Sequence, residues 1–191
     1  MISLSILICS LFERSSQLKS LLKELYRQID ENDASGIVEI LIEVDNREQS
    51  TGFKRNILYQ RAKGTYCISH DDDDTPSSFF IEELLKGIKT NPDCIGMCGY
   101  ITTNGANEKM WYISKDNPYT SKIDEHGNEI YLRYPNHITC IKTSIAQQFK
   151  FPNKTYGEDF EWATAIHNSG KIKTEYIVNR PMYYYNYKTN K

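Results

Sequence analysis

The sequence lacks a long hydrophobic run, a surplus of charge of either sign and a linker. Its best candidate for a targeting segment, residues 2–12, is shorter than the roughly 18 residues that cross a bilayer, and it has neither a basic start nor a cleavage site. The 23 Lys and Arg residues nearly balance the 25 Asp and Glu residues, which disfavours nucleic acid or a membrane surface bound by bulk electrostatics. We therefore expect a soluble chain with no transmembrane segment and no nucleic-acid partner.

Cysteines are few and show no pairing pattern. The five are an odd number, contain no C-x-x-C pair and fall mostly in apolar stretches, which predicts free buried thiols in a reducing compartment. The chain also has no internal repeat and no low-complexity segment. Its 191 residues are enough to bury a core without cross-links, so we expect a single domain over residues 1–191.

Apolar strands alternate with helices through the first half of the sequence. Strands are expected at residues 2–9, 37–44, 65–69 and 94–101, and helices at residues 18–29, 51–62 and 75–88. Because parallel strands need a crossover of a dozen or more residues, this alternation predicts an α/β fold with a Rossmann-like, mostly parallel central sheet and helices on both faces. The second half is less regular and predicts a mixed extension of the sheet. Strands are expected there at residues 109–114, 129–133, 138–142 and 171–178, an edge strand at 183–187 and a helix at 158–168.

Four consecutive aspartates, residues 71–74, follow the third expected strand. In open α/β sheets a ligand binds at the carboxyl ends of the strands, where Asp45 also falls. Neighbouring carboxylates repel one another unless a cation neutralises them, and hard divalent cations bind carboxylate oxygens. The run therefore predicts a metal site. The alternative is a solvated acidic loop in which Asp74 or Thr75 caps the next helix.

A second enzyme class also fits part of this run. Asp71, Asp73 and Thr75 match the D-x-D-x-T signature of phosphohydrolases that use an aspartate nucleophile. That signature normally follows the first strand of its fold, whereas here it follows the third, and Pro76 stands where an aliphatic residue is expected. The phosphohydrolase remains the alternative enzyme.

Several short motifs occur together in one order between residues 2 and 187. They are Val44-Asp45-Asn46, Lys54-Arg55-Asn56, Lys63-Gly64-Thr65-Tyr66, the Asp-x-Asp loop, Asn136-His137-Ile138, Tyr156-Gly157-Glu158-Asp159-Phe160-Glu161-Trp162 and Arg180-Pro181-Met182-Tyr183-Tyr184-Tyr185. With these motifs the sequence resembles the GT-A-fold glycosyltransferases of family 2, inverting enzymes with a D-x-D motif. The resemblance implies a GT-A nucleotide-diphospho-sugar transferase fold, with residues 1–100 as the nucleotide-sugar-binding half and residues 101–191 as the acceptor and catalytic half.

The resemblance also implies an activity. It is the metal-dependent transfer of a sugar, with inversion, from a nucleotide-diphosphate donor, most simply a UDP-sugar, to a hydroxyl group. The acceptor would be a glycan or a lipid-linked or protein-linked molecule, the cofactor Mn²⁺ or Mg²⁺, and the location the cytoplasm of a bacterium or of a virus-infected cell. The sequence has no Q-x-x-R-W motif of the processive synthases, which favours single transfers.

Roles for the acidic residues follow from the same resemblance. Asp45 would hydrogen-bond the nucleotide base. Asp73 would ligate the metal, and Asp71 and Asp72 would complete the metal shell or contact the ribose or the sugar. Because the run has four aspartates, the register is ambiguous by one residue, and Asp74 is an alternative ligand.

The catalytic role falls on Asp159, which would deprotonate the acceptor hydroxyl as it attacks. Arg55 and His137 would contact the donor, the alternatives being a solvated helix face for Arg55 and a packed or surface histidine for His137. Trp111 and Trp162 would either stack on an acceptor sugar or pack in the core. The third hypothesis for the function of the chain is a sugar-nucleotide-binding module without catalysis.

Overall fold

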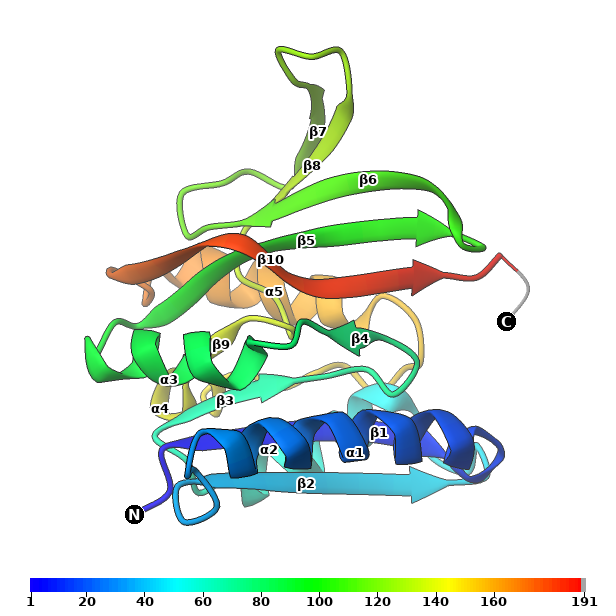
Figure 1. Ribbon diagram of the computed structural model, residues 1–191, viewed down its shortest axis with the longest axis vertical. Helices are drawn as coiled ribbons and strands as arrows, with labels where there is room; N and C mark the ends of the chain where they lie inside the picture. The colour runs from blue at the N-terminus through cyan, green and yellow to red at the C-terminus, as the bar shows by residue number, and fades with distance from the viewer. Residues whose placement is uncertain (190–191) are drawn as a thin grey trace.

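The computed structural model describes residues 1–189 as an α/β structure (Figure 1). Its elements are β1 (Leu4–Leu11), η1 (Phe12–Arg14), α1 (Ser15–Glu31), β2 (Val38–Asp45), α2 (Thr51–Arg61), β3 (Tyr66–Ser69), β4 (Thr75–Pro76), α3 (Phe80–Lys89), β5 (Cys94–Thr103), β6 (Ala106–Ile113), β7 (Thr120–Ile123), β8 (Glu129–Arg133), β9 (Cys140–Lys142), α4 (Thr143–Ala146), α5 (Glu158–Ser169) and β10 (Glu175–Tyr187). The fold class predicted from the sequence is confirmed.

The first three long strands form the parallel part of the sheet. β1 lies between β2 and β3 and pairs with both in parallel, in a register that places Leu4 beside Val38 and Tyr66. Apolar residues fill β1 on both sides, as expected for a parallel strand that is covered by helices on two faces. This register brings the carboxyl ends of β1 and β3 together, where the aspartate run begins.

Helices cover both faces of the sheet, and each face has its own core. Leu25 of α1 and Phe80 of α3 are fully buried in one cluster, and α1 and α3 lie together in front of the sheet in Figure 1. Leu58 of α2, Ala146 of α4 and Trp162 of α5 belong to the second cluster. The sheet is thus sandwiched between two apolar layers, as the sequence predicted.

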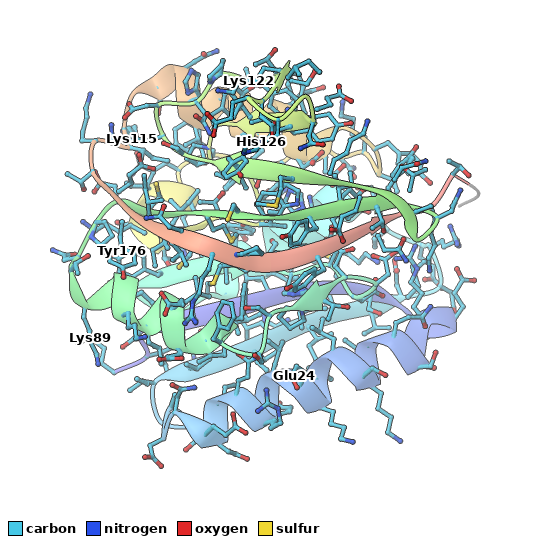
Figure 2. The ribbon with its side chains drawn as sticks, turned by 45° about the horizontal axis from the view of Figure 1, so that its top comes forward. Glu24, Lys89, Lys115, Lys122, His126 and Tyr176 are labelled. Atoms are coloured by element: carbon cyan, nitrogen blue, oxygen red, sulfur yellow. The ribbon has the colours of Figure 1, made fainter. Side chains whose placement is uncertain are left out.

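The second half adds a mixed extension, also as predicted. β9 is antiparallel to both β3 and β5, so β3 and β5 run in the same direction. β6 is antiparallel to β5, β8 is parallel to β6, and β7 is antiparallel to β8. The β7–β8 hairpin projects at one end of the molecule (Figure 1), with Lys122 and His126 labelled there, while Glu24 of α1 lies toward the other end (Figure 2).

Two expectations for this half are wrong in detail. The segments 171–178 and 183–187 were expected as separate strands, but residues 175–187 form the single strand β10. Tyr183 and Tyr184 are not at an edge, because they pair with β5 in parallel and with β4 antiparallel, whereas residues 185–187 pair with β5 alone. The strand β7 was not expected, because all its residues are exposed and show no apolar alternation.

The cysteines behave as predicted. All five are free, four are buried and Cys9 is half-buried. Burial raises the pKa of the Cys67 thiol to about 12, so this side chain is an uncharged apolar group at neutral pH. Within residues 1–189, no helix is both long enough and apolar enough to cross a membrane.

A close approach between β5 and β10 yields a stability prediction. A Cβ atom on Gly99 would lie 2.0 Å from the Tyr183 carbonyl oxygen and 2.4 Å from Trp111 Cζ2. Gly99→Ala should therefore lower the free energy of unfolding by about 1–3 kcal/mol, the usual cost of an overpacked core. Gly36→Ala is the control, because a Cβ there meets nothing within 4 Å. Urea denaturation that gives the two variants equal stability would contradict this packing.

Candidate functional site

A cleft of about 940 Å³ opens where the parallel strands end, which is a volume typical of ligand sites. Its walls come from the end of β1, the start of α2, the aspartate run, the loop before β9, the start of α5 and the middle of β10. The sequence-predicted residues that line it are Arg55, Asp71, Asp72, Asp73, Asp74, His137 and Asp159. Predicted site residues from both halves of the chain therefore line one cavity.

Arg55 of α2 links two acidic residues that are far apart in the sequence. Its Nη2 lies 3.0 Å from Asp71 Oδ1, and its Nη1 lies 2.8 Å from Glu158 Oε1. Burial alone would raise the pKa of the Asp71 carboxyl, but the Arg55 charge and a hydrogen bond with His137 hold that pKa well below its usual value. For Glu158, burial outweighs the attraction of Arg55 and raises the pKa. Arg55 is thus a buried bridge and not a solvated side chain.

His137 stands between the aspartate run and the candidate base. Its Nε2 lies 3.5 Å from Asp71 Oδ2, and its Nδ1 lies 3.4 Å from Asp159 Oδ2. Asp159 is in the first turn of α5, which Gly157 begins with a left-handed φ of 74°, a conformation that glycine adopts without strain. The groups Glu158, Arg55, Asp71, His137 and Asp159 form a continuous chain of contacts, here called the cleft network.

Asp72 and Asp73 share a different cation. Arg14, at the end of η1, places Nη1 2.9 Å from Asp72 Oδ1 and 3.4 Å from Asp73 Oδ2, and Ser10 Oγ donates to Asp72 Oδ2 at 2.6 Å. The sequence analysis missed Arg14. Its only signal was a basic residue shortly after the first strand, and nothing in the sequence showed that the strand ends of β1 and β3 would meet.

Asp74 faces the protein interior. Tyr183 Oη donates to Asp74 Oδ2 at 2.8 Å, and the backbone N–H of Asn186 donates to its Oδ1 at 3.2 Å. Burial and the nearby Asp71 charge raise the pKa of Asp74 well above its usual value. Both carboxylate oxygens of Asp74 therefore accept hydrogen bonds from β10. This argues against Asp74 as the alternative metal ligand.

Asp45 does not line the cleft. Its Oδ1 lies 2.6 Å from Lys54 Nζ, and the Gln49 backbone N–H donates to its Oδ2 at 2.7 Å. Burial works to raise its pKa, but the Lys54 and Gln49 contacts lower it below its usual value. Lys54, which also donates to the Ser10 carbonyl, is the member of this pair that lines the cleft. The predicted contact of Asp45 with a nucleotide base stays a prediction.

The aspartate run could supply only some of the ligands that a hard cation needs. Within residues 1–189, no group of three or more His, Cys, Asp or Glu side chains is arranged to hold a metal ion by itself. Mg²⁺, however, is commonly held by one or two carboxylates together with substrate phosphates. Asp71 and Asp73, which line the cleft, could supply such oxygens. Metal binding therefore stays a prediction that involves a bound donor.

The two tryptophans have different surroundings. Trp162 is 1% exposed, stacks on Phe151 at 4.6 Å between ring centroids and donates from Nε1 to the Phe149 carbonyl. The hypothesis that it stacks on an acceptor is therefore wrong, because its ring is enclosed in the second core. Trp111 is mostly buried but lines the cleft, beside Tyr183.

Removing the Arg55 bridge should destabilise the fold. In Arg55→Met, the carboxylate of Glu158 is left buried without a counter-ion, and loss of one partner from a buried pair typically costs about 3–5 kcal/mol. Arg61→Met on the same helix is the control, because its ion pair with Glu43 is exposed and worth about 0–1 kcal/mol. Denaturant unfolding should separate the two variants clearly, and adding Glu158→Gln to Arg55→Met should recover part of the loss. Equal stability of the two single variants would contradict the assigned role of Arg55.

Comparisons with known proteins place the fold. The sequence matches no family model and no curated protein. The structure, in contrast, is similar to S. aureus TarS residues 1–349 in complex with UDP-GlcNAc, with a TM-score of 0.63, 12% sequence identity, and coverage of 100% of this chain and 60% of that one. The same TarS fragment in complex with UDP gives a TM-score of 0.61 at 12% identity, covering 97% of this chain and 60% of that one.

The structure is also similar to that of an animal protein. The catalytic domain of Drosophila β1,4-galactosyltransferase 7, in complex with xylobiose, gives a TM-score of 0.56 at 14% identity, covering 95% of this chain and 68% of that one. The chain thus spans well under two thirds of the TarS fragment and about two thirds of the galactosyltransferase domain. Both relatives are GT-A glycosyltransferases. The structure of this chain is the GT-A glycosyltransferase fold.

Proposed function

We propose that the chain is a metal-dependent glycosyltransferase that moves a sugar, with inversion, from a nucleotide-diphosphate donor to an acceptor hydroxyl. One observation carries the proposal. Across the cleft of a GT-A fold, the start of the aspartate run and Asp159 contact opposite ring nitrogens of His137. The residues suited to donor binding and the residue suited to proton transfer are therefore held a few ångströms apart, as a single-displacement reaction requires.

The donor would bind at the carboxyl ends of β1 and β3. Ligands of open α/β sheets bind in that position. Arg14 and Lys54 line this part of the cleft and supply positive charge near it. The complexes of TarS with UDP-GlcNAc and with UDP support a UDP-sugar as the donor, and UDP is the first nucleotide to test.

A divalent cation is part of the proposal because this end of the cleft is acidic. Arg14 contacts Asp72 and Asp73, and Arg55 contacts Asp71 and Glu158, so the charge of both arginines is already shared with carboxylates. A diphosphate would add further negative charge to this position, so an accompanying Mn²⁺ or Mg²⁺ held by Asp71 and Asp73 would relieve the repulsion. When bound, the ion would stabilise the charge that develops on the leaving diphosphate.

Proton transfer is the part that the chain performs itself. Asp159 would accept the proton of the acceptor hydroxyl while that oxygen attacks the anomeric carbon from the side opposite the leaving group. The His137 ring lies beside the Asp159 carboxylate, with Nδ1 3.4 Å from Oδ2. Attack in one displacement inverts the anomeric carbon, and no covalent intermediate with the protein is required.

The two alternatives from the sequence find less support. In the phosphohydrolase hypothesis Asp71 would be the nucleophile, but its signature normally follows the first strand, whereas here it follows β3, and the fold is that of GT-A enzymes. A binding module without catalysis would need no base at the cleft, whereas Asp159 lines it. Transfer activity distinguishes this module from an enzyme.

Donor binding tests the metal assignment. Calorimetry with UDP should show binding that strengthens when Mn²⁺ is added, and Asp73→Ala should reduce this Mn²⁺-dependent affinity by at least about 10- to 100-fold, the loss seen when even outer partners of a metal site are removed. Asp30→Ala, an exposed acidic residue of α1, is the control for a change of charge alone. Unchanged Mn²⁺-dependent affinity in Asp73→Ala would refute the assigned ligand.

Turnover tests the assigned base. Asp159→Asn keeps the shape of the side chain but cannot accept the proton, so turnover should fall by at least about 100-fold, within the usual range for a positioned general base. UDP affinity and the melting temperature should stay nearly unchanged, because the base acts in the transition state. Glu161→Gln, one exposed carboxylate further along α5, should retain activity. An Asp159→Asn variant with more than about a tenth of wild-type transfer would leave the mechanism without its base.

A further inference from the structure

Part of the cleft lining is aromatic. Trp111 of β6 and Tyr131 of β8 are paired neighbours in the sheet, and Tyr183 of β10 lies in the same row across Gly99. Side chains at alternate positions of a strand share a face. The paired residues Ile113 and Arg133, two positions after Trp111 and Tyr131, therefore lie on the same face of the sheet. Trp111, Ile113, Tyr131, Arg133, Tyr183 and Tyr185 all line the cleft. The sheet itself therefore forms one wall of the cavity.

Arg133 is unusual among the arginines of the chain. The sequence has seven, and six of them have a carboxylate partner: Arg14, Arg27, Arg47, Arg55, Arg61 and Arg180. Within residues 1–189, no carboxylate oxygen lies within 4.0 Å of an Arg133 nitrogen, the distance that defines an ion pair. Among the arginines that line the cleft, it is the one without a carboxylate partner in the part of the chain that the structure describes.

The Arg133 side chain is nevertheless held in place. Its Nη1 donates to the carbonyls of Thr120 and Leu132 at 2.7 and 2.8 Å. Its guanidinium carbon lies 4.1 Å from the ring centroid of Tyr119 and 5.1 Å from that of Tyr131. Two carbonyls and two rings fix the group, and because only Nη1 is used, donors of the planar fork remain for a ligand.

Arg133 is linked to the start of α5, which carries Asp159, through two aromatic contacts. The Arg133 guanidinium lies over the Tyr119 ring, and this ring packs edge-on against Phe160 at 4.9 Å between centroids. Phe160 follows Asp159 directly in α5. Burial raises the pKa of Tyr119, and the Asp159 charge adds to this rise, which agrees with their proximity. A molecule whose hydroxyl reaches Asp159 from the side of these rings would lie against Tyr119 and Arg133.

We propose that Arg133 and the tyrosines around it form an acceptor subsite for a sugar or polyol that carries an anionic group, phosphate or carboxylate, near the reacting hydroxyl. The inference rests on the proposed glycosyltransferase function and names the chemical class of its acceptor. Arginine binds both anions through paired N–H donors, and the tyrosine rings offer apolar faces with polar tips to a carbohydrate. The cleft is lined by seven acidic side chains, so an anionic acceptor would be repelled from most of it and favoured beside a cation without a carboxylate partner.

The test compares matched neutral and anionic probes in the presence of UDP and Mn²⁺. The carboxylate arm uses methyl β-D-glucopyranoside against methyl β-D-glucuronide, and the phosphate arm uses glycerol against glycerol 3-phosphate, with dissociation constants from saturation-transfer NMR titrations. The wild type should prefer the anionic member of at least one pair by about 10-fold or more, in line with a charge-assisted hydrogen bond. Arg133→Gln should abolish that preference, and Arg133→Lys should keep part of it.

A control arginine and a donor measurement make the outcomes decisive. Arg180→Gln should leave the preference unchanged, since Arg180 also stacks on an aromatic ring but is paired with Glu83 and lies outside the cleft. Melting temperatures establish that each variant is folded. UDP affinity, measured by calorimetry, should be the same in Arg133→Gln and the wild type.

The outcomes separate the two proposals. If the wild type binds UDP but prefers neither anionic probe, or if Arg133→Gln weakens UDP binding as much as probe binding, the subsite is refuted while the donor site stands. If the wild type binds no UDP but shows an anion preference that Arg133→Gln abolishes, the glycosyltransferase proposal fails and the anion site stands. A preference confined to one pair identifies the anion as phosphate or carboxylate.

Discussion

The buried guanidinium of Arg55 is the contact on which the candidate site depends. It is 5% exposed and holds Asp71, at the end of β3, and Glu158, at the start of α5, by direct ion pairs. A buried charge is tolerated only when its partners are in place, so α2, the β3 end and α5 are constrained to one arrangement. Because Glu158 directly precedes Asp159 in α5, the Arg55 contact also constrains the helix start that carries the candidate base. The position of the candidate base is thereby coupled to that of the aspartate run, although about ninety residues of sequence separate them.

This constraint divides the aspartate run into parts with different surroundings. Asp71 belongs to the cleft network, Asp72 and Asp73 share Arg14, and Asp74 accepts hydrogen bonds from β10. Four adjacent carboxylates are thus tolerated because the run has several partners and not because one cation neutralises them all. The folded chain compensates most of this charge by itself. What it does not compensate is the added charge of a diphosphate, which is the physical reason for a cation that arrives with the donor.

Local signals in the sequence predict much of the fold and only part of the site. Apolar runs and helix signals placed β1 to β3, α1 and α2, because each element is recognisable from its own residues. The third helix was expected from residue 75, but Thr75–Pro76 form β4 and α3 begins at Phe80, because the pairing of β4 with β10 is tertiary. The motifs pointed to Asp71, His137 and Asp159, which do meet in the cleft. Arg14 and Arg133 were not identified, because an arginine becomes part of a site only through partners on other strands. β10 was divided for the same reason: its irregular register with β5 depends on tertiary pairing.

The two ends of the cleft differ in charge, and this difference gives the proposed reaction a direction. The end at β1 and β3 is rich in carboxylates and suits a donor that brings its own cation, whereas the end at β6 and β8 has aromatic rings and the unpaired Arg133. Asp159 lies between them, with His137 on one side and Phe160, packed on Tyr119, on the other. An anionic acceptor is disfavoured beside the aspartates and favoured beside Arg133. Charge would therefore direct the acceptor to the Arg133 side of the base, while the cation that accompanies the donor is favoured beside the aspartates.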